Sequence, residues 1–238
     1  MKLRFTQKYT RSLLILLSGL LFLHCNRTID DILPHTERIF PMEPGKYRIS
    51  LVIDTTFDAA GPVVDTYYKK EELGGAEVDL EGRTVRRLQT YRSEVASGSN
   101  YNFVPYRLYT LYLDPEGPGV RYAERMEENK RYLVLKFPVS PGIRWNGNLF
   151  NILNSQVYQY RQVDSTVVIR DHTYDNCVVV IQKNNLNGLI RKEFAYEIYA
   201  PEVGRIKKVD RTLVFDGANG EFNAAQSYIY IEEVLEHN

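Results

Sequence analysis

Residues 177–198, CVVVIQKNNLNGLIRKEFAYEI, contain the pattern that decides the fold. An apolar run at 177–183 is followed by NNLNG, whose Asn-Gly ending suits a hairpin. Apolar and charged residues then alternate through Phe194, Tyr196 and Ile198, which is typical of a strand with one buried face. The stretch therefore predicts two antiparallel strands, with these three side chains facing inward.

The chain downstream repeats this arrangement. Residues 205–215 and 226–235 are rich in strand formers, and DGANG at 216–220 forms a turn between them. Residues 165–170 are expected to add a fifth strand. Because no strand–helix–strand pattern occurs, we predict an all-β protein. We expect antiparallel meander sheets forming a sandwich or half-barrel, with little helix beyond a signal peptide.

The first half predicts more strands, with one ambiguous segment. Gly74 and Gly75 are expected to interrupt the chain after the second strand. Residues 121–131, RYAERMEENKR, consist of strong helix formers, but a hairpin turning at 128–130 is the favoured alternative because a clear strand follows. The strands expected in this half cover residues 46–57, 63–70, 83–93, 101–113 and 132–137.

A six-residue phrase occurs twice. Residues 40–45 (FPMEPG) and 137–142 (FPVSPG) share F-P-x-x-P-G, in which two prolines and a glycine make a rigid turn and the phenylalanine can plug the layer beneath. The repeat suggests two related halves, 40–136 and 137–238, within one β-rich domain at 40–238. Convergent turn chemistry is the alternative.

The N-terminus predicts export. Residues 1–24 carry four basic residues and no acid, followed by an apolar run at 13–23, which is the order of a secretory signal. The run is about half the length that a membrane-spanning helix needs. It ends on Cys25 and lacks the small-residue pattern of an ordinary signal-peptidase site.

The sequence FLHC at 22–25 resembles the signal of bacterial lipoproteins, with His24 where the family has a small residue. The resemblance implies cleavage before Cys25 and acylation of that cysteine, so the membrane would be a partner through the acyl anchor. Residues 25–39 are polar and aperiodic, and we interpret them as a flexible tether. A signal anchor with an incidental cysteine is the alternative.

Composition excludes some functions. Removal of residues 1–24 leaves 26 basic and 30 acidic residues, a net charge of −4, which gives no basic surface for nucleic acid. Cys177 would be the single remaining thiol besides Cys25, and its position at the head of CVVVIQK indicates a core residue.

No catalytic or metal-binding motif is found, and no cofactor is expected. Asp171, His172 and Asp175 could hold a cation, but a solvated turn is the simpler interpretation. A carboxylate pair of the kind that glycosidases use cannot be recognised from sequence alone.

The segment RWNGNLF at 144–150 holds the sole tryptophan and gives the candidate ligand-binding residues Trp145, Asn146 and Asn148. The ring could stack on a sugar or peptide while the asparagines supply hydrogen bonds. The favoured alternative is a tryptophan that plugs one end of the core beside an Asn-Gly turn.

Several phrases resemble an uncharacterised family of exported lipoproteins from the Bacteroidota: VDTYYKKEE, DLEGR, ENKRYLVLKFPVSPGIRWNGNLFN and FAYEIYAPEVGRIKKV. The resemblance implies an outer-membrane lipoprotein of β-rich fold with no assigned activity, on the periplasmic or the surface face. The phrase YAPEVG also resembles a turn of half-barrel lipoprotein and lipid carriers. In that phylum, the motif Asp-Ser/Thr implies O-glycosylation at Thr55 and Ser165.

Three hypotheses follow for function. The first is a non-enzymatic binding or structural module of the cell envelope, with an envelope protein or glycan as partner. The second is a carrier of an apolar ligand in a curved sheet, suggested by 18 tyrosines and 10 phenylalanines. The third is a carbohydrate-active enzyme. They predict a filled core, an open cavity and a cleft with paired acids, respectively.

Overall fold

The structure is a computed structural model that describes residues 38–94, 101–115, 119–217 and 220–238. The described residues belong to one compact unit, His35–Asn238. The predicted signal peptide, Cys25 and most of the tether lie outside the described residues. The described ranges contain no apolar helix of the length that a membrane span requires.

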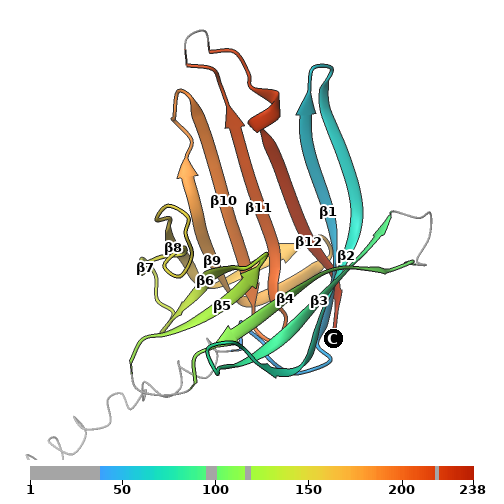
Figure 1. Cartoon of the computed structure of the whole chain (residues 1–238), viewed down its shortest axis with the longest axis vertical. Helices are drawn as coiled ribbons and strands as arrows, with labels where there is room; N and C mark the ends of the chain where they lie inside the picture. Colours follow the sequence, from blue (N-terminus) through green and yellow to red (C-terminus); the bar gives the residue numbers. More distant parts are fainter. Residues whose placement is uncertain (1–37, 95–100, 116–118, 218–219) are drawn as a thin grey trace, which may run out of the picture. The chain divides into compact units, whose positions relative to one another are not determined.

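All regular structure in the described unit except one short 3₁₀ turn, η2 (Ala224–Gln226), is β-strand, which confirms the predicted class. The strands form a single antiparallel sheet in the order β6-β5-β4-β3-β2-β1-β12-β11-β10-β9-β8-β7 (Figure 1). They are β1 (Tyr47–Asp58), β2 (Gly61–Val78), β3 (Thr84–Glu94), β4 (Val104–Leu113), β5 (Arg121–Glu127), β6 (Lys130–Phe137), β7 (Arg144–Asn146), β8 (Val157–Ile169), β9 (His172–Asn185), β10 (Arg191–Ala200), β11 (Gly204–Val214) and β12 (Tyr228–His237).

The order shows two six-stranded meanders, β1–β6 and β7–β12, joined where β1 pairs with β12. The change from one meander to the next falls at 137–143, next to the predicted boundary between halves. Phe40 and Phe137 of the two F-P-x-x-P-G phrases lie buried in the same core, and Gly45 and Gly142 both have positive φ angles, 85° and 81°. Common ancestry of the halves stays a prediction.

The sheet curls until its two ends meet, so the unit is a nearly closed barrel rather than a sandwich (Figure 1). The amide of Leu133 in β6 donates to the carbonyl of Gly147, just after β7, at 2.9 Å. The Tyr160 hydroxyl of β8 donates to the Lys136 carbonyl at 2.8 Å and accepts from the Lys136 amide at 2.9 Å. These bonds form a seam between the two edges of the sheet, β6 on one side and β7 and β8 on the other.

An apolar cluster fills part of the barrel interior. It takes side chains from each strand from β2 to β10, as expected where alternate residues of a closed sheet point inward. Its buried members are Ile39, Phe40, Leu73, Leu88, Tyr109, Leu111, Ala123, Leu133, Val134, Leu135, Phe137, Val139, Trp145, Tyr158, Tyr160, Val178, Val180 and Tyr199.

The ambiguous segment at 121–131 is a hairpin, as favoured from sequence. Glu128 and Asn129 have φ angles of 49° and 62°, the paired left-handed conformation of a two-residue hairpin turn. Pairing of β5 with β4 and β6 buries Ala123 and Glu124. Tertiary pairing thus overrides the helix propensity of this stretch.

Two expectations were wrong. Gly74 and Gly75 do not end a strand, because β2 runs through them to Val78 with a bulge in its pairing to β3. The face of β10 that was predicted to point inward packs elsewhere: Ile198 contacts a second apolar cluster, whereas Tyr199 of the opposite face joins the interior core.

Cys177 is a member of that second apolar cluster. The residue is fully buried there with its thiol free, and burial raises the pKa of the thiol to about 11. Sγ lies 3.3 Å from the Tyr174 carbonyl as donor. The expectation of a core cysteine is confirmed.

Candidate functional site

Trp145, the first candidate ligand-binding residue, lies at the seam of the barrel. Its side chain is buried, and its Nε1 donates to the Leu133 carbonyl at 2.8 Å. The ring packs on Tyr158 and Tyr160, with centroids 5.9 and 4.7 Å away. These contacts are those of a plug that joins β6 to β7 and β8.

Asn146 and Asn148 organise the loop that follows. The Asn146 Oδ1 accepts from the amides of Asn148 and Gln156 at 3.1 and 3.0 Å. Asn148 Nδ2 donates to the Asn154 carbonyl at 2.7 Å, and its Oδ1 accepts from Asn151 Nδ2 at 3.2 Å. None of the three candidates lines a cavity described below, and a ligand-binding role for them stays a prediction.

The hydrogen bonds of these asparagines fix the backbone of a short stretch of exposed apolar side chains, which we call the apolar loop. Its members are Leu149, Phe150, Ile152 and Leu153, with exposed fractions of 52%, 45%, 96% and 43%. Asn151 pins the loop to β6 because its Nδ2 also donates to the Arg131 carbonyl at 2.8 Å. A fixed loop with this much exposed apolar surface indicates a contact site rather than a core element.

The other candidates from sequence lie apart from one another. Thr55 is half-buried in β1, and Ser165 in β8 donates its hydroxyl to the Cys177 carbonyl at 3.1 Å. Asp171 occupies the β8–β9 turn, and Asp175 accepts from Thr166 Oγ1 at 2.7 Å. Over the described residues, no group of three or more His, Cys, Asp or Glu is arranged to hold a metal ion.

The most distinctive feature, which the sequence does not predict, is a cavity of about 420 Å³ on the inner side of the curved sheet. Strands from both halves line it, from β1–β5 on one side to β11 and β12 on the other, so it lies inside the barrel. Its lining combines tyrosines with charges of both signs: Asp54, Tyr67, Lys69, Thr90, Tyr106, Arg107, Tyr109, Arg125, Glu127, Arg205, Lys208, Asp210, Tyr228, Tyr230 and Glu232.

A second cavity of about 250 Å³ adjoins the first. The two share four lining residues, Arg125, Glu127, Lys208 and Asp210. The second cavity extends toward the seam, where Tyr132, Val134, Tyr158 and Leu153 of the apolar loop line it. We call the two cavities together the groove. Its size is in the range of small-molecule sites.

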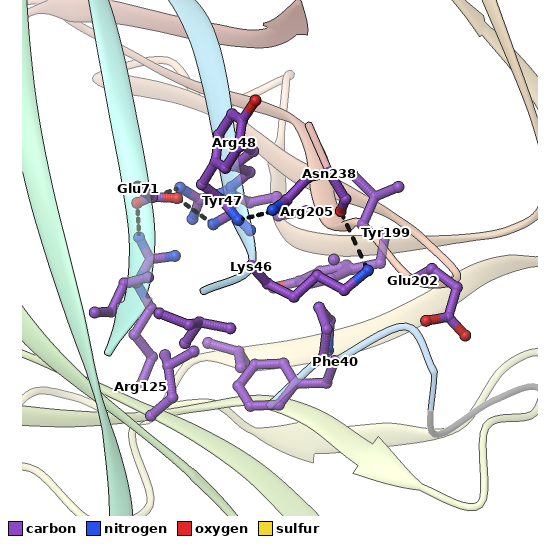
Figure 2. A pocket seen from close by; sticks show the side chains of 17 residues that line it. Phe40, Lys46, Tyr47, Arg48, Glu71, Arg125, Tyr199, Glu202, Arg205 and Asn238 are labelled. Carbon is purple, nitrogen blue, oxygen red and sulfur yellow. Dashed lines mark hydrogen bonds and ion pairs between the residues drawn. The ribbon is translucent and has the colours of Figure 1, made fainter. Parts of the chain in front are cut away.

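Beneath the groove lies a network of buried ion pairs made by Arg48, Lys69, Glu71, Arg125, Glu197, Arg205 and Glu232. Glu71 accepts from Arg125 Nη2 at 3.0 Å and also pairs with Arg48 (Figure 2). Lys69 Nζ lies 2.9 Å from Glu71 Oε1. A small cavity of about 40 Å³ beside it has room for a few water molecules at most.

Arg205 is the centre of this network. Its guanidinium donates to Glu197 Oε1 at 2.9 Å and to both oxygens of Glu232 at 3.1 and 3.2 Å. Lys69 Nζ also contacts Glu232 at 3.0 Å, and the Tyr199 and Tyr230 hydroxyls donate to Glu197 and Glu232 at 2.5 and 2.7 Å. The buried carboxylates are therefore fully paired, which is the condition for burying charge.

The ion pairs decide the protonation of these carboxylates. Burial alone would raise their pKa values, but adjacent cations more than offset it: Arg48 and Lys69 hold the pKa of Glu71 well below 4.5, and Arg205 lowers those of Glu197 and Glu232. Arg125 likewise lowers the pKa of Glu127 to about 2 against the effect of burial. All four are carboxylates at neutral pH.

Asp54 differs from them. Burial and then the charge of Asp65, its partner across β1 and β2, raise its pKa. No ion pair or hydrogen bond of the Asp54 side chain is present among the described residues. The charge of Arg92 opposes this rise but does not overcome it, so Asp54 is a groove carboxyl without a directly paired cation.

The sequence carries a partial signal for the network. Residues 69–72 of β2 read KKEE, two lysines followed by two glutamates. Because side chains alternate between the faces of a strand, each face of β2 receives one lysine and one glutamate. Lys69 and Glu71 face the interior, whereas Lys70 and Glu72 pair at 2.8 Å on the more exposed face. Sequence alone does not tell which face is buried.

No protein-family model matches the chain, and no curated protein matches it. Two solved structures are similar at low identity. One is a protein from Bacteroides fragilis described as exported, with a YmcC-like fold: 12% identity, TM-score 0.36, covering 83% of this chain and 98% of that one. The other is a LolA-superfamily protein from Nitrosomonas europaea: 12% identity, TM-score 0.25, covering 88% and 92%. Membership of a lipoprotein family stays a prediction from the sequence.

Proposed function

We propose that this protein is an exported, non-enzymatic carrier that holds an amphiphilic ligand in the groove of its curved sheet. The observation that carries the proposal is the pair of adjoining cavities, about 420 and 250 Å³, inside a barrel whose remaining interior is packed. Export and an acyl anchor at Cys25, in the outer membrane, complete the proposal and rest on the signal at residues 1–25.

The lining favours an amphiphile over the wholly apolar ligand expected from the aromatic content. An alkane would cover charged side chains such as Lys208 and Glu127 without replacing their contacts with water, which is costly. A molecule with a polar group and an apolar part can satisfy both the inner wall and the apolar loop at its edge. Tyrosine suits such a ligand because it offers a ring and a hydroxyl.

The carboxylates give little support to the glycosidase hypothesis. A general acid must hold its proton near neutral pH, usually through a raised pKa. Glu71, Glu127, Glu197 and Glu232 have lowered pKa values because of their cation partners, so they are poorly suited to that role. Asp54 is a groove carboxyl with a raised pKa and is the one of these five suited to act as the acid, with an ionised carboxylate as its partner.

A binding module for an envelope partner is the second candidate. Apolar side chains are exposed near three connections at the same end of the sheet: Val63 and Val64 after the β1–β2 turn, Leu189 and Ile190 before β10, and Phe222 before β12. Phe57 and Phe222 hold two of these connections together, with ring centroids 5.0 Å apart. Such clustering is typical of contact surfaces.

The carrier proposal is tested by displacement of the neutral probe N-phenylnaphthylamine from the purified protein by dodecyl amphiphiles below their micelle concentrations. Filling the groove with Gln182→Trp, which replaces a residue lining the second cavity, is expected to weaken binding at least about tenfold. The matched control is Gln162→Trp, an exposed position of β8. Failure of every amphiphile to bind, or equal effects of the two variants, would reject the carrier.

A further inference from the structure

Lys208 of β11 occupies the junction of the groove, because it lines both of its cavities. Its Nζ lies 3.9 Å from Glu197 Oε1, beyond hydrogen-bond distance, and 5.7 Å from the Tyr230 ring centre. In the ranges that the structure describes, no hydrogen bond to this ammonium is present. Lys208 therefore presents donors to the groove that no protein group uses.

The carboxylates around Lys208 are already engaged by other cations. Glu127 pairs with Arg125 at 2.6 Å, Asp210 with Lys183 at 3.0 Å, and Glu197 with Arg205 at 2.9 Å. An anion that binds Lys208 does not have to displace any of these pairs. The first cavity as a whole is lined by five basic and four acidic side chains, so its charge also favours an added anion.

The second cavity continues from Lys208 to less polar surroundings. Tyr132, Val134 and Tyr158 form part of its wall, and Leu153 brings the apolar loop to its edge. Leu153 is 43% exposed and Ile152 is 96% exposed, so apolar surface continues beyond the cavity. An ammonium with free donors at one end and apolar surface at the other fits a molecule with an anionic head and an alkyl chain.

We propose that the ligand is an anionic amphiphile whose carboxylate or phosphate binds Lys208 Nζ while its alkyl chain lies along the second cavity toward Leu153. This inference rests on the proposed carrier function and adds the chemical class of the ligand. It names Lys208 as the residue that selects for negative charge.

The head-group contact is tested with dodecanoate against dodecyl maltoside, which has the same chain and a neutral head. Dodecanoate is expected to bind at least about tenfold more tightly, since a hydrogen-bonded ion pair in a partly enclosed site contributes on this scale. Lys208→Met should remove that preference, and Lys208→Arg should restore most of it. Dodecyl phosphate replaces dodecanoate in a parallel titration and shows which anion fits better.

Lys207→Met is the matched control for charge. Lys207 is the adjacent residue on the opposite face of β11, where its Nζ pairs with Glu233 at 2.7 Å, and it lines neither cavity. Its loss removes the same charge from the protein, so dodecanoate affinity should stay within about twofold of the unmodified protein if the effect of Lys208 is local.

The alkyl contact is tested with Leu153→Asn, which should weaken dodecanoate and dodecyl maltoside alike, by about three- to tenfold for an exposed apolar contact. Leu80→Asn is the control, because Leu80 is fully exposed in the β2–β3 turn. An effect confined to Leu153 supports the placement of the chain, and equal effects of both variants contradict it.

The outcomes separate this inference from the carrier function itself. If no dodecyl compound binds, the carrier proposal fails. If dodecanoate and dodecyl maltoside bind equally, or if dodecyltrimethylammonium binds more tightly than both, the carrier stands and the anion site is wrong. If Lys208→Met and Lys207→Met reduce dodecanoate binding equally, the preference reflects net charge and Lys208 is not the site.

Discussion

Arg205 donates to both carboxylate oxygens of Glu232, at 3.1 and 3.2 Å, and thereby ties β11 to β12 below the groove. The same guanidinium reaches Glu197 of β10 and approaches Glu71 of β2 at 3.6 Å. One side chain thus connects strands of both meanders through charge. The floor of the groove is an ion network rather than an apolar layer.

Replacement of Arg205 is expected to destabilise the barrel. Arg205→Met leaves Glu197 and Glu232 buried without their main cation, and breaking a buried pair in this way costs about 3–5 kcal/mol. Urea unfolding followed by circular dichroism measures the loss. The control is Arg191→Met, whose surface pair with Glu193 should contribute about 1 kcal/mol or less. Similar unfolding midpoints for both variants would show that the network does not support the fold.

Acid is expected to unfold the protein. The folded-state pKa values of Glu71, Glu127, Glu197 and Glu232 lie below the ordinary 4.5, so the folded state binds fewer protons than the unfolded state as pH falls. Their stabilising contribution is present above about pH 5 and is lost progressively down to about pH 2. Urea midpoints measured across this range should therefore fall with pH. A flat profile would contradict the pairing of these carboxylates.

Substitution of Trp145 separates a packing role from a binding role. Trp145→Phe keeps an aromatic ring but leaves the Leu133 carbonyl without its donor, which should cost about 1–3 kcal/mol. Trp145→Ala should cost about 3–5 kcal/mol, because it also opens a cavity against Tyr158 and Tyr160. Dodecanoate affinity of Trp145→Phe should stay within about twofold. A large loss of affinity without a loss of stability would instead favour ligand stacking on this ring.

The acyl anchor at Cys25 is tested by metabolic labelling with radioactive palmitate in a bacterial host. The unmodified chain and Cys177→Ala should both incorporate label, since Cys177 is buried and has a raised pKa. Cys25→Ser should incorporate none. Label that persists in Cys25→Ser would contradict the lipoprotein signal.

Much of the fold could be predicted from local patterns. The alternation around Phe194 and the NNLNG turn predict the β9–β10 hairpin, and the clear strand at 132–137 favours a hairpin turn at 128–130 despite strong helix formers. These features depend on residues that are near one another in the sequence. The strand pairing that follows is therefore visible without the structure.

The site was not predictable in the same way, because its contacts join distant residues. Glu71 meets Arg125 across 54 positions and Lys69 meets Glu232 across 163. Closure of the barrel buries charged residues that an open sheet would leave in water. For the same reason the orientation of β10 is opposite to the expected one: Glu197 faces the groove. The sole tryptophan distinguishes the seam in the sequence, whereas the groove is lined by lysines, glutamates and tyrosines, which occur throughout the chain.

The most direct test of the carrier is a crystal structure of the protein with dodecanoate, collected together with one of Lys208→Met under the same conditions. The account predicts dodecanoate inside the groove, with a carboxylate oxygen within about 3 Å of Lys208 Nζ and the chain directed toward Leu153, and weaker or no occupancy in the variant. A groove without dodecanoate would contradict the carrier. The same bound position and occupancy in both proteins would contradict the anion site at Lys208 and leave the carrier standing.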